Sequence, residues 1–205
     1  MINEFTLGSI EILNNHPINK RRISRGYMPA NIILLRDPGN KLPKFPKKKN
    51  WIAINSMPLE IGISKLAGFK VIKVPLGKDY YENLKNVSDY SIKYLKKYPN
   101  KDFYIHFKET DIPGHDGNFK EKQRMVEYLD KVFFSELKNM KNSIIIVTCD
   151  HATPTTLRSH SKDPVPVLVH GLGKDYAKEF NELSCSKGSL HINHGYELLS
   201  TIQNL

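Results

Sequence analysis

The chain has 205 residues, 40% of them hydrophobic, so it can bury the core of one α/β domain or of one domain with a small appendage. Its net charge of +10 favours anionic partners such as phosphorylated metabolites or nucleic acid, although a solvated, lysine-rich surface explains the charge as well. No apolar segment approaches the ~20 residues of a membrane span, and no secretory signal is visible. The two cysteines lack metal-binding spacing, so we expect reduced thiols in a cytoplasmic protein.

The N-terminal stretch combines a helical pattern with basic residues. Apolar residues at helical spacing predict a helix over residues 2–14, which ends because Pro17 disfavours helical backbone in the residue before it. A compact basic loop containing Arg22 follows. A buried strand is then predicted over residues 32–35, with Arg36 at its end. Either guanidinium could bind a phosphate or carboxylate in a planar, bidentate manner, and a solubilising turn is the alternative.

Strands and helices alternate from residue 51 onward, after a Lys-rich, Pro-containing linker over residues 40–49. The predicted strands cover residues 51–54, 71–74, 103–107, 144–147 and 165–169. The predicted helices cover residues 57–66, 80–98, 118–140 and 196–202. This alternation predicts an α/β fold with a mostly parallel sheet that is covered by helices on both faces.

Two carboxylates and three imidazoles follow the ends of two predicted strands. They are Asp111, His115, Asp150, His151 and His160. The first two lie on a turn after residues 103–107, and the others follow residues 144–147. Because the carboxyl ends of parallel strands meet at one edge of a sheet, we expect a single site that can hold divalent metal and act on a phosphoryl group. Three threonines, Thr153, Thr155 and Thr156, offer hydroxyls nearby, but a Pro154-containing loop explains them equally well.

Ordered motifs surround these residues. They are His16-Pro-Ile-Asn19-x-x-Arg22, Gly26-x-x-Pro29-Ala-Asn31-x-x-Leu-Leu-Arg36, Asp111-x-x-Gly-His115-Asp-Gly, Cys149-Asp150-His151-Ala-Thr-Pro, Ser159-His160-Ser-Lys-Asp163-Pro-Val-Pro166 and Cys185-x-Lys-Gly188-Ser-Leu190. Together they resemble the motifs of the archaeal-type, 2,3-bisphosphoglycerate-independent phosphoglycerate mutases of the alkaline phosphatase superfamily. The resemblance runs over nearly all of residues 9–205 and implies an alkaline-phosphatase-like fold.

The resemblance divides the candidate ligands between two divalent metal ions. It implies that Asp111, His115 and His160 bind one ion, and that Asp150 and His151 bind the other. Manganese is the metal implied first, with zinc or magnesium as alternatives.

The resemblance also implies a substrate, a reaction and two domains. Arg36 and Arg22 would bind phosphoglycerate. The family reaction, part of glycolysis and gluconeogenesis, moves a phosphoryl group between the 2- and 3-hydroxyls of glycerate through a phosphoserine. Residues 1–40 would be the end of an inserted substrate domain with its return strand, and residues 41–205 the metal-binding domain.

Departures from the family pattern leave activity open. The family's N-terminal part supplies an Asp and the nucleophilic Ser that complete the second metal site. Neither is present, so we expect a fold that is incomplete at the N-terminus and only one complete metal site. Leu59-Glu60-Ile61 precedes Gly62 where the family has a Lys, and residues 74–78 replace its Gly-Ala-Thr-Gly stretch. We therefore expect a second chain that supplies the missing half, or a homodimer that covers the open sheet edge.

Three functions remain as hypotheses. The first is a phosphoglycerate mutase completed by its missing half. The second is another phosphoryl transfer or hydrolysis, as in homoserine kinase-like enzymes or phosphomonoesterases. The third is a non-catalytic remnant or a basic binding module. A phosphorylated small molecule is the expected partner, in preference to nucleic acid or a membrane.

Overall fold

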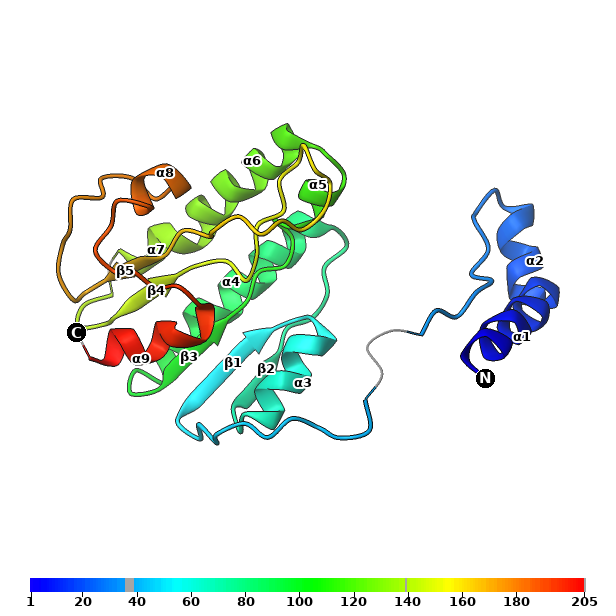
Figure 1. Cartoon of the computed structure of the whole chain (residues 1–205), viewed down its shortest axis with the longest axis horizontal. Coiled ribbons are helices and arrows are strands. Elements are labelled where there is room, and N and C mark those ends of the chain that lie inside the picture. Colours follow the sequence, from blue (N-terminus) through cyan, green and yellow to red (C-terminus); the bar gives the residue numbers. More distant parts are fainter. Residues whose placement is uncertain (36–38, 139, 205) are drawn as a thin grey trace. The chain divides into compact units, whose positions relative to one another are not determined.

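The computed structural model describes residues 1–35, 39–138 and 140–204 (Figure 1). The chain divides into two compact units, Met1–Lys44 and Phe45–Leu205. None of the described helices is both long enough and apolar enough to cross a membrane.

Two helices form the first unit. α1 (Ile2–Asn15) ends where the sequence predicts, at the residue before the proline. The predicted basic loop is wrong, because Arg22 lies in a second helix, α2 (Pro17–Ser24), which starts at the proline, a favourable first residue of a helix. Asn19 is only 3% exposed, and its Nδ2 donates to the carbonyl oxygens of Leu13 and Ala30 at 2.8 and 3.0 Å. Its Oδ1 accepts from the N–H of Ala30 at 2.9 Å. One buried amide thus ties the chain that follows α2 to the end of α1.

The buried strand predicted over residues 32–35 is wrong. These residues form no strand, and their apolar side chains are 44–72% exposed. A strand needs the backbone of a neighbouring strand, and the regular elements in the described part of this unit are helices. The N–H of Ile33 bonds instead to the hydroxyl of Ser9, at 3.1 Å.

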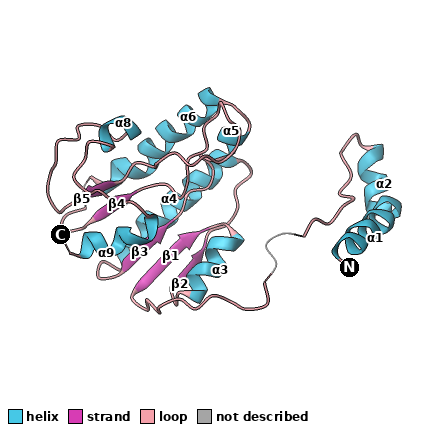
Figure 2. Ribbon diagram, viewed as in Figure 1, coloured by secondary structure: helices cyan, strands magenta, loops and turns pink. Residues whose placement is uncertain are grey.

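A three-stranded parallel sheet organises the second unit (Figure 2). β1 (Trp51–Asn55) lies between β2 (Lys70–Lys73) and β3 (Asp102–Ile105). Its residues are buried from Ile52 onward, which is why this strand is a continuous apolar run in the sequence.

Helices cover both faces of this sheet, as predicted. α3 (Pro58–Leu66) lies on one face, where Nδ2 of Asn55 bonds to the hydroxyl of Ser64. α4 (Tyr80–Lys97) lies on the other face, where Ile54 packs into a buried apolar cluster with this helix. Neighbouring residues of a strand point to opposite faces, so Ile54 and Asn55 contact different helices.

The helix predicted over residues 118–140 forms in consecutive pieces. They are α6 (Phe119–Leu129), the π-helical turn η1 (Asp130–Phe134) and α7 (Ser135–Leu137). The residues that form its buried stripe are Met125, Leu129, Phe133 and Leu137. They recur every fourth position, a longer period than the 3.6 residues of an α-helical turn, and the wider π-helical turn helps to keep them on one face.

The parallel sheet ends at β3, short of the extent predicted. β4 (Ile145–Val147) pairs with β5 (Leu168–His170) in a separate antiparallel sheet, and no ladder joins β3 to β4 in the described ranges. Ile105 of β3 and Ile145 of β4 nevertheless pack against the same buried cluster of helical side chains. The outer edge of β3 is therefore open on the side of the unit where the core continues.

The remaining elements are short. They are α5 (Ile112–His115), α8 (Glu182–Cys185), the 3₁₀ turn η2 (Gly195–Glu197) and α9 (Leu198–Gln203). Only α5 takes part in the site described below.

Candidate metal centre

Two loops meet beyond the carboxyl ends of β3 and β4. The loop after β3 contains α5, with Asp111 at its N-cap position. The loop after β4 is closed by a bridge between Ala152 and Ser161. The two loops touch at Gly114, where a Cβ atom would lie 2.6 Å from the carbonyl oxygen of Thr153. The glycine of the predicted turn is thus required because the backbones approach so closely.

Asp111, His151 and His160 form the centre of the site. Each offers a ligand atom, and these atoms all lie within 4.8 Å of one another. This is close to the separation of donors that share one ion, since each donor lies about 2.0–2.2 Å from a bound zinc-like metal. One carboxylate and two imidazoles are a donor set that suits borderline divalent metals, so the residues present fit such an ion.

His115 and Asp150 border this triad. Nε2 of His115 lies 3.2 Å from Nε2 of His160 and 3.4 Å from Oδ2 of Asp111. The Asp150 carboxylate is 70% exposed, and its Oδ2 lies 3.3 Å from Nε2 of His151. The structure thus brings all the predicted metal ligands into one connected group. Their division between two ions stays a prediction.

Two donors hold the carboxylate of Asp111. Lys108 forms an ion pair with Oδ2, and the hydroxyl of Thr153 donates to Oδ1 at 2.6 Å. Partial burial raises the pKa of Asp111, but the bonds from Lys108 and Thr153 outweigh this effect and lower the pKa to about 2. The carboxylate is therefore ionised at neutral pH and ready to bind a cation.

Thr153 also contacts His151, another residue of the triad. Its Oγ1 lies 3.1 Å from Nδ1 of His151, and its side chain is buried. Lys122 donates to the Thr153 carbonyl oxygen at 2.8 Å. Lys108 and Lys122 were not identified from the sequence, because the period of a strand or helix does not reveal which surface lysine turns inward.

A buried polar group lies near the cluster on the α3 side of the sheet. Nε2 of His106 faces Oε1 of Glu60 across 4.0 Å. Burial lowers the pKa of His106, while the carboxylates of Glu60 and Asp150 act in the opposite direction. Glu60 belongs to the segment that departs from the family's Lys-Gly pattern. The segment beside His106 therefore carries a carboxyl group that the resemblance does not imply.

The two arginines that were predicted to bind substrate, Arg22 and Arg36, belong to the first unit of the chain. Nε of Arg22 donates to the carbonyl oxygen of Met28 at 2.9 Å, and its guanidinium lies 6.0 Å from the ring centroid of Tyr27. Arg22 belongs to the first unit and the metal cluster to the second, so its contact with substrate stays a prediction. Arg36 falls outside the described residues.

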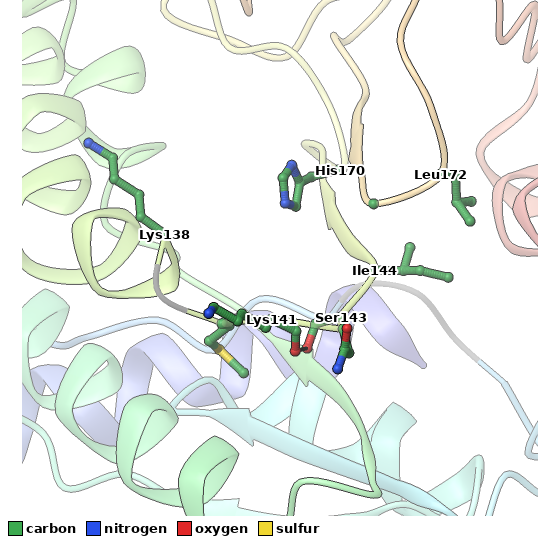
Figure 3. Close-up of a pocket in the computed structure, with 9 residues that line it drawn as sticks. Lys138, Lys141, Ser143, Ile144, His170 and Leu172 are labelled. Carbon is green, nitrogen blue, oxygen red and sulfur yellow. Dashed lines mark hydrogen bonds between the residues drawn. The ribbon is translucent and has the colours of Figure 1, made fainter.

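A separate cavity of about 650 Å³ lies at the opposite end of β4 (Figure 3). Its lining residues are Lys138, Met140, Lys141, Asn142, Ser143, Ile144, His170, Gly171 and Leu172. They precede β4 or end β5, whereas the metal cluster follows β4. The cavity is therefore distinct from the metal cluster.

Similar proteins match nearly the whole of this chain but only about half of their own length. It is 36% identical over 213 residues to the 2,3-bisphosphoglycerate-independent phosphoglycerate mutase of Methanoculleus marisnigri, covering 99% of this chain and 50% of that protein. The mutase of Aeropyrum pernix is 37% identical, with 97% of this chain and 50% of that protein covered. The chain thus spans about half the length of the curated relatives it matches.

Solved structures agree with this similarity. The PH0037 protein from Pyrococcus horikoshii superposes with a TM-score of 0.74 and 32% identity, over 92% of this chain and 51% of that chain. The cofactor-independent phosphoglycerate mutase from Thermoplasma acidophilum has the same fold, with a TM-score of 0.58 and 24% identity over 98% of this chain and 50% of that one. The resemblance and the fold class inferred from the motifs are thereby confirmed.

The match to a defined family covers the whole site. Residues 63–200, which contain the triad and its neighbours, match the metalloenzyme superfamily. This stretch is more than half of the chain. Together with the clustered carboxylate and imidazole donors, it shows that the chain belongs to the metalloenzyme superfamily.

Proposed function

We propose that this chain is the metal-binding part of a 2,3-bisphosphoglycerate-independent phosphoglycerate mutase, an isomerase that interconverts 2- and 3-phosphoglycerate in glycolysis and gluconeogenesis. The observation that carries the proposal is the cluster of Asp111, His151 and His160 within a chain that resembles such mutases over nearly its full length. A glycolytic role would place the protein in the cytoplasm.

The residues of the cluster would hold divalent metal, with two manganese ions as the first expectation. A bound ion would supply positive charge to the phosphoryl oxygens during transfer. Asp111 enters this arrangement already ionised, because Lys108 and Thr153 stabilise its charge. His115 and Asp150 lie close enough to complete the coordination of one ion or to begin that of a second.

Basic residues around the cluster support a phosphorylated substrate. Lys108 lies in the loop after β3 and Lys122 lies in α6, and the whole chain carries a net charge of +10. Positive charge at a cleft raises the local concentration of an anionic substrate. We assign phosphoglycerate binding also to Arg22 and Arg36, by resemblance to the family.

Completion of the enzyme would come from the half of the relatives' length that this chain does not match. We propose that this half, carried by a second chain, supplies the serine nucleophile and a strand for the open edge of β3. The alternative is a homodimer, in which a second copy of this chain covers that edge without supplying the serine. An unpaired strand edge is a ready template for such pairing. Residues 1–40 would then be the end of the inserted substrate domain, and residues 41–205 the metal-binding domain.

A reconstitution assay tests the proposal. The chain would be incubated with Mn²⁺ and 3-phosphoglycerate, alone and together with the other half of the Methanoculleus marisnigri relative, and 2-phosphoglycerate would be measured. We expect activity only in the combined sample, and its loss in the Asp111→Asn variant. No activity in the combined sample, when both halves are folded and bound to each other, would reject the mutase assignment.

A further inference from the structure

We propose that Thr153 is a positioning residue that fixes the tautomer of His151 and the orientation of Asp111, so that both present lone pairs to a divalent cation. The inference deepens the proposed function, since it rests on metal binding at this cluster. It does not depend on which phosphorylated substrate the protein uses.

The argument begins with the single proton of the Thr153 hydroxyl. Oγ1 lies 2.6 Å from Oδ1 of Asp111, and the other oxygen of this group, Oδ2, forms an ion pair with Lys108, as an ionised carboxylate does. An ionised carboxylate accepts hydrogen bonds but cannot donate them. The Thr153 proton must therefore point toward Asp111, and Oγ1 has only lone pairs left for its other contact.

That other contact is with Nδ1 of His151, at 3.1 Å. Since Oγ1 can only accept there, Nδ1 must carry the hydrogen. A neutral imidazole has one N–H and one lone pair, so the lone pair of His151 is placed on Nε2. The partner of one ring nitrogen commonly sets which nitrogen of a histidine binds metal.

The surroundings of Nε2 show what a bound cation would change. Nε2 of His151 lies 3.3 Å from Oδ2 of Asp150. With the hydrogen on Nδ1, two acceptors face each other across this short distance. A cation bound by both would turn the repulsion into attraction, and 3.3 Å is a usual separation for neighbouring donors about 2.0–2.2 Å from one ion.

The loop is built to hold Thr153 in place. Its side chain is only 4% exposed, and its backbone carbonyl accepts from Nζ of Lys122 at 2.8 Å. Gly114 packs so closely against this residue that a Cβ atom would lie 2.9 Å from the Thr153 Cγ2. A hydroxyl on a residue that is held this closely can orient its two partners at little further entropic cost.

Two substitutions separate the hydroxyl from the shape of the side chain. Thr153→Val keeps the volume and removes the hydroxyl, whereas Thr153→Ser keeps the hydroxyl. Thr156→Val, at an exposed position of the same loop, is the matched control. Each full-length protein would be examined by long-range ¹H–¹⁵N NMR without metal, to identify the His151 tautomer, and by competition titration with Zn²⁺ and with Mn²⁺.

We expect the Nδ1–H tautomer of His151 in the wild-type, Thr153→Ser and Thr156→Val proteins, with similar metal affinity in all three. In Thr153→Val we expect a mixture of tautomers and metal affinity that is lower by about 10- to 100-fold. Wild-type tautomer and affinity in a folded Thr153→Val protein would overturn the inference. So would an Nε2–H tautomer in the metal-free wild type. Both readouts precede any reaction, so an absence of mutase activity would leave them intact.

Discussion

The imidazole rings of His151 and His160 are stacked, with centroids 3.7 Å apart and planes at 29°. His151 lies four residues after the end of β4, and the bridge between Ala152 and Ser161 brings the chain back beside it. Each ring restricts the rotation of the other. The loop therefore holds two nitrogen donors near Asp111 by its own packing, which reduces the ordering that metal binding requires.

The first prediction concerns the charge at the centre of the cluster. Asp111→Asn removes the only carboxylate of the triad and leaves an amide in its place. We expect metal affinity to fall by more than about 100-fold, because changing a residue that merely orients a ligand already lowers affinity by about 10- to 100-fold. The measurement is a competition titration with Mn²⁺. Asp116→Asn, an exposed position just beyond α5, should bind metal like the wild type.

The second prediction concerns the contact between the two loops. In Gly114→Ala the new Cβ would lie 2.6 Å from the Thr153 carbonyl oxygen, so one loop must shift. We expect a loss of about 1–3 kcal/mol in the free energy of unfolding, together with weaker metal binding.

Gly62→Ala provides the control for this change. Gly62 lies within α3, and a Cβ atom there would have no neighbour within 4 Å. Replacing glycine by alanine inside a helix stabilises by about 0.5–1 kcal/mol. Urea unfolding of both variants would therefore give shifts of opposite sign. An unchanged midpoint for Gly114→Ala would show that the loops separate freely.

The third prediction concerns pH. Burial lowers the pKa of His106 below its ordinary value of 6.5, so the unfolded chain binds a proton at this residue more readily than the folded protein does. The free energy of unfolding should therefore fall as the pH decreases through 6.5. His106→Gln should remove part of this loss. His170→Gln, at an exposed position, should not.

Urea unfolding at pH 7.5 and at pH 5.5 measures the effect. The relevant quantity is the change in the free energy of unfolding between the two pH values, compared from one protein to the next. A His106→Gln protein that loses as much stability as the wild type between these pH values would contradict the prediction.

The convergence of the two loops could be predicted from the sequence, but the arrangement within the cluster could not. The first follows from a general rule, since residues 103–107 and 144–147 both precede potential ligands and strands of an α/β unit end at a common edge. The position of His151 beside Asp111 depends on the bridge between Ala152 and Ser161, a contact with no local sequence signal. Thr153 was named only as a loop hydroxyl, because its two partners come from different parts of the chain.

The wrong prediction over residues 32–35 has a related cause. Four consecutive apolar residues satisfy the local criterion for a buried strand. Whether they become one depends on a partner strand, and the described part of Met1–Lys44 contains helices only. Local pattern thus predicts which segments can pair. It does not reveal whether a neighbour is present.

The last prediction concerns Lys108, which forms an ion pair with the same Asp111 oxygen that lies nearest to His115. A cation must displace this ammonium group or share the oxygen with it. Lys108→Met keeps the length of the side chain and removes the charge. We expect this variant to bind Mn²⁺ several-fold more tightly at pH 7, and to be less stable without metal because Asp111 loses a charged donor. Lys120→Met, exposed at the start of α6, serves as the control for the change in net charge. Weaker metal binding in Lys108→Met alone would show that the lysine orients the carboxylate for the ion and does not compete with it.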